Sequence, residues 1–203
     1  ADWKQTEDAL VFGSGYLTSL GVLRALMNSR DAVFYDELSH RCLLEGIQLS
    51  GAHAESFPHN DTQRLRAALD RSRDEYDAVL IVTEGIFSMD GDRCDLESLR
   101  AIKQDYDAWL MVDEAHSAGV LGPEGAGLTA RGEGVELAMG TLSKALGGYG
   151  GYVAGSGRLV DFLVNRATTL IYSTGLPASV VAGALTSLKI LRGRAEGREQ
   201  LQE

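Results

Sequence analysis

Ala78-Val-Leu-Ile-Val-Thr83 and Trp109-Leu-Met-Val-Asp113 are the two stretches that decide the fold, and the segment Leu96–Asp105 lies between them. Both stretches are short apolar runs, which is typical of strands that are buried on both faces of a sheet. The segment between them repeats its apolar residues at helical spacing. A strand, a helix and a second strand in this order predict a βαβ unit with two parallel strands.

The same alternation extends over the whole chain. The further strands that we expect are Ala9–Phe12, Ala32–Tyr35, Ala54–Phe57, Leu137–Thr141 and Tyr152–Ala154. The further helices that we expect are Leu17–Met27, Ser39–Leu49, Thr62–Arg71, Arg158–Ala167 and Ser179–Leu191. Asp61 and Asp95 are suited to cap two of the helices. With only three prolines and no linker or repeat, the sequence predicts one α/β domain over residues 1–203, a three-layer α/β/α sandwich with a mainly parallel sheet.

Composition excludes several classes of protein. Lys and Arg number 19 and Asp and Glu number 29, so the net charge of −10 disfavours binding to nucleic acid. No apolar run approaches the roughly 20 residues of a membrane span, and the amino end does not resemble a signal peptide, so we expect a cytoplasmic protein without a membrane partner. Cys42 and Cys94 fit neither a disulfide framework nor a zinc site, and we expect packed thiols and no metal.

The two ends of the sequence suggest a fragment or an excised domain. The chain begins at Ala1 and runs directly into the apolar stretch Asp8–Phe12. It ends in a polar helical stretch, residues 192–203, that has no cap.

Gly13-Ser-Gly-Tyr16 follows the first expected strand and precedes a helix. This arrangement directs free backbone N–H groups and the positive end of the helix dipole at an anion, so it indicates a phosphate site. An ordinary strand-to-helix turn explains the same residues about as well, because the third glycine of the dinucleotide-binding motif is absent.

Val112-Asp-Glu-Ala-His116 places Asp113 and His116 at the carboxyl end of a strand. The letters Asp-Glu-Ala-His match the magnesium-binding box of a nucleic-acid helicase, but that function also needs a Walker lysine loop, which the sequence lacks. The alternative to a functional motif is a strand that simply ends in two solvated carboxylates.

Gly140-Thr-Leu-Ser-Lys-Ala-Leu-Gly-Gly148 is the most informative stretch. Lys144 lies between hydroxyl residues and glycines, which predicts a surround lined by small residues and hydroxyls. A lysine that is buried or lies near a cation loses its proton more readily, and the neutral amine can form a Schiff base with a carbonyl. A surface lysine in a glycine-rich loop is the alternative.

Together the three motifs supply the parts of a pyridoxal phosphate site, namely a phosphate anchor, a partner for the pyridinium nitrogen and a reactive amine. At this point the sequence resembles the α-oxoamine synthases, a family of fold type I pyridoxal phosphate enzymes. The stretches that carry the resemblance are Asp36-Glu-Leu-Ser-His40, Thr83-Glu-Gly-Ile-Phe-Ser-Met-Asp-Gly-Asp92, Val112-Asp-Glu-Ala-His-Ser117, Gly140-Thr-Leu-Ser-Lys-Ala-Leu-Gly147 and Ile171-Tyr-Ser-Thr-Gly-Leu-Pro177.

The resemblance implies an aspartate aminotransferase-like large domain with pyridoxal 5'-phosphate as its cofactor. By that resemblance Lys144 binds the cofactor covalently and then moves the α-proton of an amino acid. Asp113 faces the ring nitrogen, and His116 hydrogen-bonds the phenolic oxygen, with Ser88 as a second candidate for that oxygen. His40 stacks on the face of the ring. Alone, His40 would be interpreted as a capping residue and Ser88 as a turn residue.

The resemblance also implies the phosphate contacts and a partner subunit. Backbone N–H groups of Ser14, Gly15 and Tyr16 and the hydroxyl of Thr141 are expected at the phosphate. Thr174 is expected to serve the cofactor of the neighbouring subunit, which implies a homodimer. His53 and His59 match no site motif and are interpreted as surface or structural residues.

The expected reaction joins an amino acid to an acyl thioester, carried by coenzyme A or by a carrier protein, with loss of CO₂. The stretches Phe34–His40, Tyr152–Ser156 and Leu159–Arg166 are most similar to family members that condense alanine with a pimeloyl thioester. Members that use glycine and an acetyl thioester follow closely. In this family the arginine for the substrate carboxylate lies outside the region that the chain covers, so we expect cofactor binding without full turnover. A helicase or ATPase fragment and a catalytically silent scaffold are the rival hypotheses.

Overall fold

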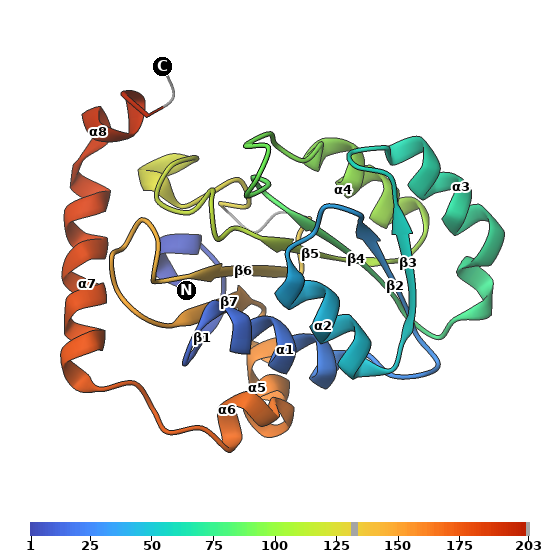
Figure 1. Ribbon diagram of the computed structural model, residues 1–203, viewed down its shortest axis with the longest axis horizontal. Helices are drawn as coiled ribbons and strands as arrows, with labels where there is room; N and C mark the ends of the chain where they lie inside the picture. Colours follow the sequence, from blue (N-terminus) through green and yellow to red (C-terminus); the bar gives the residue numbers. More distant parts are fainter. Residues whose placement is uncertain (131–133, 202–203) are drawn as a thin grey trace.

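A seven-stranded sheet forms the centre of the molecule in the computed structural model, which describes residues 1–130 and 134–201 (Figure 1). The order of the strands across the sheet is β1-β7-β6-β5-β4-β2-β3. Their bounds are β1 Asp8–Phe12, β2 Ala32–Asp36, β3 His53–Phe57, β4 Val79–Glu84, β5 Trp109–Asp113, β6 Leu137–Thr141 and β7 Gly151–Gly155.

The sheet is mainly parallel, as the sequence predicts. Strand β7 pairs antiparallel with both β1 and β6, while the pairs β6–β5, β5–β4, β4–β2 and β2–β3 are parallel. The predicted βαβ unit is confirmed, because β4 and β5 lie side by side with Glu84 opposite Asp113. The carboxyl ends of β2, β4, β5 and β6 therefore meet at one edge of the sheet.

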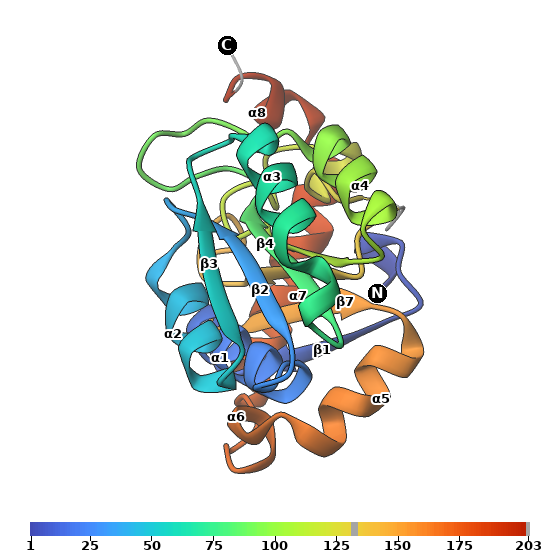
Figure 2. The same cartoon turned by 90° about the vertical axis from the view of Figure 1, so that its right-hand side faces the viewer.

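Helices cover both faces of the sheet (Figures 1 and 2). Their bounds are α1 Gly15–Leu26, α2 Arg41–Ser50, α3 Thr62–Ser72, α4 Leu96–Asp105, α5 Gly157–Arg166, α6 Thr168–Ile171, α7 Ala178–Gly193 and α8 Ala195–Glu199, with short 3₁₀ turns at Asp2–Lys4, Arg73–Glu75 and Pro123–Gly125. Within the described residues, no helix is both long and apolar enough to cross a membrane.

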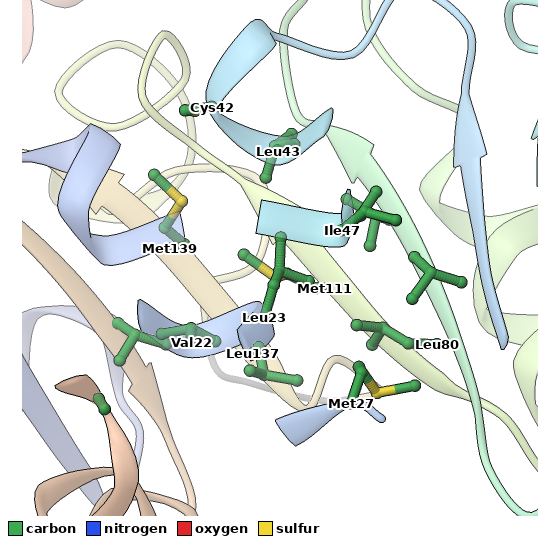
Figure 3. Close-up of a cluster of buried hydrophobic side chains, with 14 of the residues drawn as sticks. Val22, Leu23, Met27, Cys42, Leu43, Ile47, Leu80, Met111, Leu137 and Met139 are labelled. Carbon is green, nitrogen blue, oxygen red and sulfur yellow. The ribbon is translucent and has the colours of Figure 1, made fainter. Parts of the chain in front are cut away.

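Two apolar cores separate the layers. On one face, Leu23 of α1 and Leu43 of α2 pack on strand residues such as Leu80 and Met111 (Figure 3). On the other face, residues of α3 and α4 pack on side chains of β2, β3, β4 and β5, and a third, smaller cluster includes side chains of β7. All four residues named here are fully buried, so the three-layer sandwich is confirmed.

The predicted strands and helices agree with the structure to within two residues at each end. Asp61 and Asp95 cap their helices, because their side chains accept hydrogen bonds from the N–H groups of Arg64 and Ser98. Helix α1 begins two residues earlier than predicted, since Ser14 caps it and accepts from the N–H of Leu17 at 3.1 Å. The short helix α6 was not predicted, whereas α8 lies within the stretch 192–203 that was expected to be helical.

Candidate active site

The residues predicted for the site follow the carboxyl ends of the strands, as the topology requires. His40 comes after β2. Asp113 ends β5 and His116 follows it, while Thr141 ends β6 and Lys144 follows it. The charges of Lys144 and His40 both act on the carboxyl group of Asp113, which shows that these strand ends face one another.

Lys144 contacts His116. The Nζ atom of Lys144 lies 2.7 Å from Nε2 of His116. Burial lowers the pKa of His116, and the positive charges of Lys144 and His40 lower it further. The imidazole is therefore neutral at pH 7, and its Nε2 accepts a hydrogen bond from the ammonium group of Lys144.

The prediction that small residues and hydroxyls line the surroundings of Lys144 is wrong in two respects. The side chain of Lys144 is exposed. The hydroxyl of Thr141 lies 2.8 Å from that of Ser143 and donates to the carbonyl of Gly150 at 2.9 Å, so the hydroxyls bind other groups and not the amine. Among the described residues, the hydrogen-bond partner of the Lys144 amine is His116.

Asp113 is a buried carboxylate with 3% of its surface exposed. Burial raises its pKa, while a hydrogen bond from the N–H of Ala115 and the charges of Lys144 and His40 act in the opposite direction. Its Oδ1 accepts from Ala115 at 2.8 Å, and within the described part of the chain Oδ2 has no protein donor. A cationic N–H group that approached Oδ2 would replace the lost solvation, which fits a pyridinium nitrogen.

His40 caps α2 from the turn after β2. Its Nδ1 accepts from the N–H of Cys42 and lies 2.9 Å from the sulfur of the same residue. Its own N–H donates to the Oε1 atom of Glu84 at 2.5 Å. The capping alternative is thus confirmed, yet the imidazole is exposed and free to cover a flat ring.

The start of α1 forms a cradle beside Thr141. The N–H groups of Gly15 and Tyr16 have no acceptor within the helix, because they belong to its first turn. A Cβ atom at Gly15 would lie 3.3 Å from the Cβ of Thr141, and one at Gly151 would lie 2.5 Å from the nitrogen of Gly15. The two glycines therefore let backbone donors and a hydroxyl converge closely enough to bind one phosphate group.

The structure does not bring Ser88 and Thr174 to this group. Ser88 is exposed in the turn after β4, and Thr174 is exposed between α6 and α7. No contact joins either side chain to Lys144, Asp113 or His116 in the described ranges. Their predicted roles stay predictions.

A family model described as "Aminotransferase class I and II" matches residues 1–203. The chain belongs to the aminotransferase class I and II family. The 8-amino-7-oxononanoate synthase of Methylocella silvestris is 47% identical over 194 residues, which cover 95% of this chain and 55% of that protein. The enzyme of the same name from Granulibacter bethesdensis is 48% identical over 188 residues, which cover 93% of this chain and 49% of that protein.

A solved structure of serine palmitoyltransferase from S. paucimobilis, with bound PLP-myriocin aldimine, has a TM-score of 0.94 and 34% sequence identity to this aminotransferase class I and II chain. It aligns with 99% of this chain and 51% of its own. Serine palmitoyltransferase is an α-oxoamine synthase, so the predicted resemblance is confirmed. The chain spans about half the length of the relatives that it matches.

Glu84 lies in the candidate site, but the sequence motifs did not identify it as a site residue. It is 2% exposed, ends β4, and lies opposite Asp113 on β5. Burial and the charge of Asp113 raise its pKa to about 7, although the N–H of His40 acts to lower it. Since Thr83-Glu84 ends a strand just as Val112-Asp113 does, position in the sheet was the signal that could have identified it.

We expect Glu84→Gln to stabilise the protein above pH 7. The folded state keeps a proton on Glu84 up to about pH 7, whereas an unfolded glutamate releases it near pH 4.5, so stability is lost as the pH rises between these values. The amide still accepts from His40 without a buried charge. Urea unfolding at pH 8 should show a gain of about 3 kcal/mol, and at pH 4 a much smaller one.

The exposed carboxyl of Glu97 on α4 provides the matched control. Glu97→Gln should change the unfolding free energy by about 1 kcal/mol or less at pH 8. An equal effect of Glu84→Gln at both pH values would contradict the assignment of a raised pKa to Glu84.

One well-formed cavity in the described part of the chain lies away from these residues. Its volume is about 690 Å³, and its lining includes Trp109 and Leu137 at the amino ends of β5 and β6. Cavity and reactive groups are thus at opposite ends of the parallel strands. The chemistry of the side chains, and not the size of the hollow, identifies the candidate site.

Proposed function

We propose that this chain is the pyridoxal 5'-phosphate-binding part of an 8-amino-7-oxononanoate synthase. The enzyme would condense L-alanine with a pimeloyl thioester, carried by coenzyme A or by a carrier protein, and release CO₂. The observation that carries the proposal is the contact between Lys144 and a neutral His116 beside the buried carboxylate of Asp113. The two relatives reported above, which bear this name and are 47–48% identical, support the choice of substrates.

When bound, pyridoxal phosphate supplies an aldehyde that captures amines and a ring that accepts electrons. Lys144 is the amine that would hold this aldehyde, and its free amine would move the α-proton of the amino acid. His116 accepts a hydrogen bond from Lys144, which directs the amine toward the strand ends. Asp113 provides the fixed negative charge that keeps a ring nitrogen protonated.

The remaining residues orient the cofactor and exclude water. The first turn of α1 would bind the phosphate, and the hydroxyl of Thr141 would join it by turning from the carbonyl of Gly150. The imidazole of His40 would cover one face of the ring. Ser88 is the second donor that we assign to the phenolic oxygen. Thr174 reaches the site of a partner subunit in a homodimer, and we place the enzyme in the cytoplasm.

One observation favours a different substrate pair within the same family. The serine palmitoyltransferase structure superposes with a TM-score of 0.94, so another α-oxoamine synthase, such as a glycine C-acetyltransferase, is the second candidate. An assay of the full-length enzyme with alanine, glycine and serine against pimeloyl, acetyl and palmitoyl thioesters separates these activities. Preference for glycine with the acetyl thioester would replace our first choice.

Cofactor binding tests the proposal directly. Addition of pyridoxal phosphate should give a yellow solution whose visible band disappears on reduction with borohydride, and peptide mapping should find the reduced label on Lys144. The helicase hypothesis predicts ATP-dependent activity without the visible band. A colourless protein, or a label distributed over several lysines, would refute the proposal.

A further inference from the structure

His59 lies at the centre of a hydrogen-bonded cluster near the candidate site. Its Nδ1 is 3.0 Å from Oδ1 of Asp36, and its Nε2 is 2.8 Å from Oδ2 of Asp92. Asn60 donates to both carboxylates, through its N–H to Asp36 and through its side-chain amide to Asp92. The ring of Phe87 packs edge-on against the imidazole at 4.4 Å between centroids. His59 therefore joins two segments that are distant in the sequence.

The first of these segments is the turn that carries His40. Asp36 is fully buried at the end of β2, and its Oδ1 also accepts from the N–H of Leu38 at 3.0 Å. Its carbonyl accepts from the N–H of Ser39 at 2.9 Å. His40 comes next and caps α2. The carboxylate that binds His59 thus also fixes the turn that presents the imidazole of His40.

The second segment is the loop that carries Ser88. The N–H of Phe87 donates to the carbonyl of Asp92 at 3.0 Å, and the N–H of Gly91 donates to the carbonyl of Phe87 at 2.9 Å. Ser88 lies inside this closed loop. Because Asp92 and Phe87 both contact His59, the position of the loop depends on that imidazole.

We propose that His59 is a positioning residue that ties the turn carrying His40 to the loop carrying Ser88, and so sets the affinity of the site for pyridoxal phosphate. This inference rests on the proposed function, because it assigns both segments to the same cofactor. His59 acts through Asp36 and Asp92 and does not itself touch the cofactor.

The protonation state of His59 decides how many of its bonds form. The groups that face it are the carboxylates of Asp36 on β2 and Asp92 in the loop, and Glu37, whose Oε1 accepts the backbone N–H of His59 at 3.0 Å. Burial lowers its pKa, but the hydrogen bonds and charges of Asp36 and Asp92 act more strongly together, and the net pKa is raised. An imidazolium donates to both carboxylates, whereas a neutral imidazole donates to only one.

The cofactor-loaded protein allows a direct test with His59→Gln. The dissociation constant of pyridoxal phosphate is measured by the visible band from pH 6 to pH 9. At pH 6 we expect binding about tenfold weaker in the variant, the size of one charge-assisted hydrogen bond. At pH 9 the two proteins should converge, since the wild-type bridge is lost as the pH rises through the pKa of His59.

His53→Gln is the matched control, because His53 is a half-exposed histidine on β3 that stacks on Tyr76. It should leave the pH profile unchanged. Asp92→Asn is the second variant, to be used if His59→Gln does not fold. It keeps the contact between His59 and the buried Asp36, and it should weaken the binding of pyridoxal phosphate by the amount that we expect for His59→Gln. Equal weakening at every pH, or an unchanged profile, would overturn the inference while the proposed function stands. Absence of the visible band in the wild-type protein would instead refute the function and this inference with it.

Discussion

Lys144→Ala should reduce the borohydride-stable label to background. The lysines of the chain are Lys4, Lys103, Lys144 and Lys189. Lys4 is buried against Glu114, and Lys103 is paired with Glu136 and only 11% exposed, so neither amine is accessible to an aldehyde. Lys144 is accessible and lies 2.7 Å from a neutral imidazole.

The control for this substitution is Lys189→Ala. Lys189 is exposed on α7, so an aldehyde that reacts with any accessible amine would label both positions. We expect Lys189→Ala to label like the wild type. In turnover assays of the full-length enzyme, Lys144→Ala should lower the rate by about 10²–10⁴-fold, the contribution of a positioned acid–base group. A label that persists in Lys144→Ala would remove the basis for assigning the enzyme.

The sequence predicted the sheet well because its central strands are buried on both faces. Leu80, Ile81 and Val82 are all fully buried, and so are Leu110 and Met111. Strands in this position are continuous apolar runs in the sequence, and the ends of each run mark the ends of the strand. The predicted start of α1 was two residues too late, because the helix begins where the side chain of Ser14 accepts a hydrogen bond. Apolar periodicity does not show that boundary.

The core of the site was predictable for a topological reason. Asp113 ends β5, and His116 and Lys144 follow β5 and β6. Parallel strands bring their carboxyl ends to one edge of the sheet. What the sequence could not supply were the contacts between segments. Glu84 and His59 differ from other glutamates and histidines only through partners on other strands and loops. The exposure of Lys144 likewise depends on how the folded segments pack around it. The residue type and the flanking glycines do not determine that exposure.

Glu114 belongs to the same strand-end turn as Asp113 and His116, yet its partners come from elsewhere. It is fully buried and forms an ion pair with Lys4, itself 2% exposed, near the start of the chain. Its carboxylate also accepts from the N–H and the hydroxyl of Thr129, both at 2.8 Å. Lys4 donates in addition to the carbonyl of Ala126, and burial lowers its pKa to about 7. Glu114 thus joins three segments below the reactive turn.

We expect Glu114→Ala to destabilise the protein by about 3–5 kcal/mol, because it leaves a buried amine and the donors of Thr129 without their acceptor. Denaturant unfolding measures the loss. Lys4→Met combined with Glu114→Leu should recover much of it, since apolar side chains of similar volume often replace a buried ion pair at little cost. Asp105→Ala, which breaks the exposed pair with Arg66, should cost about 1 kcal/mol or less. If Glu114→Ala cost no more than Asp105→Ala, the buried pair would not stabilise the turn that carries Asp113 and His116.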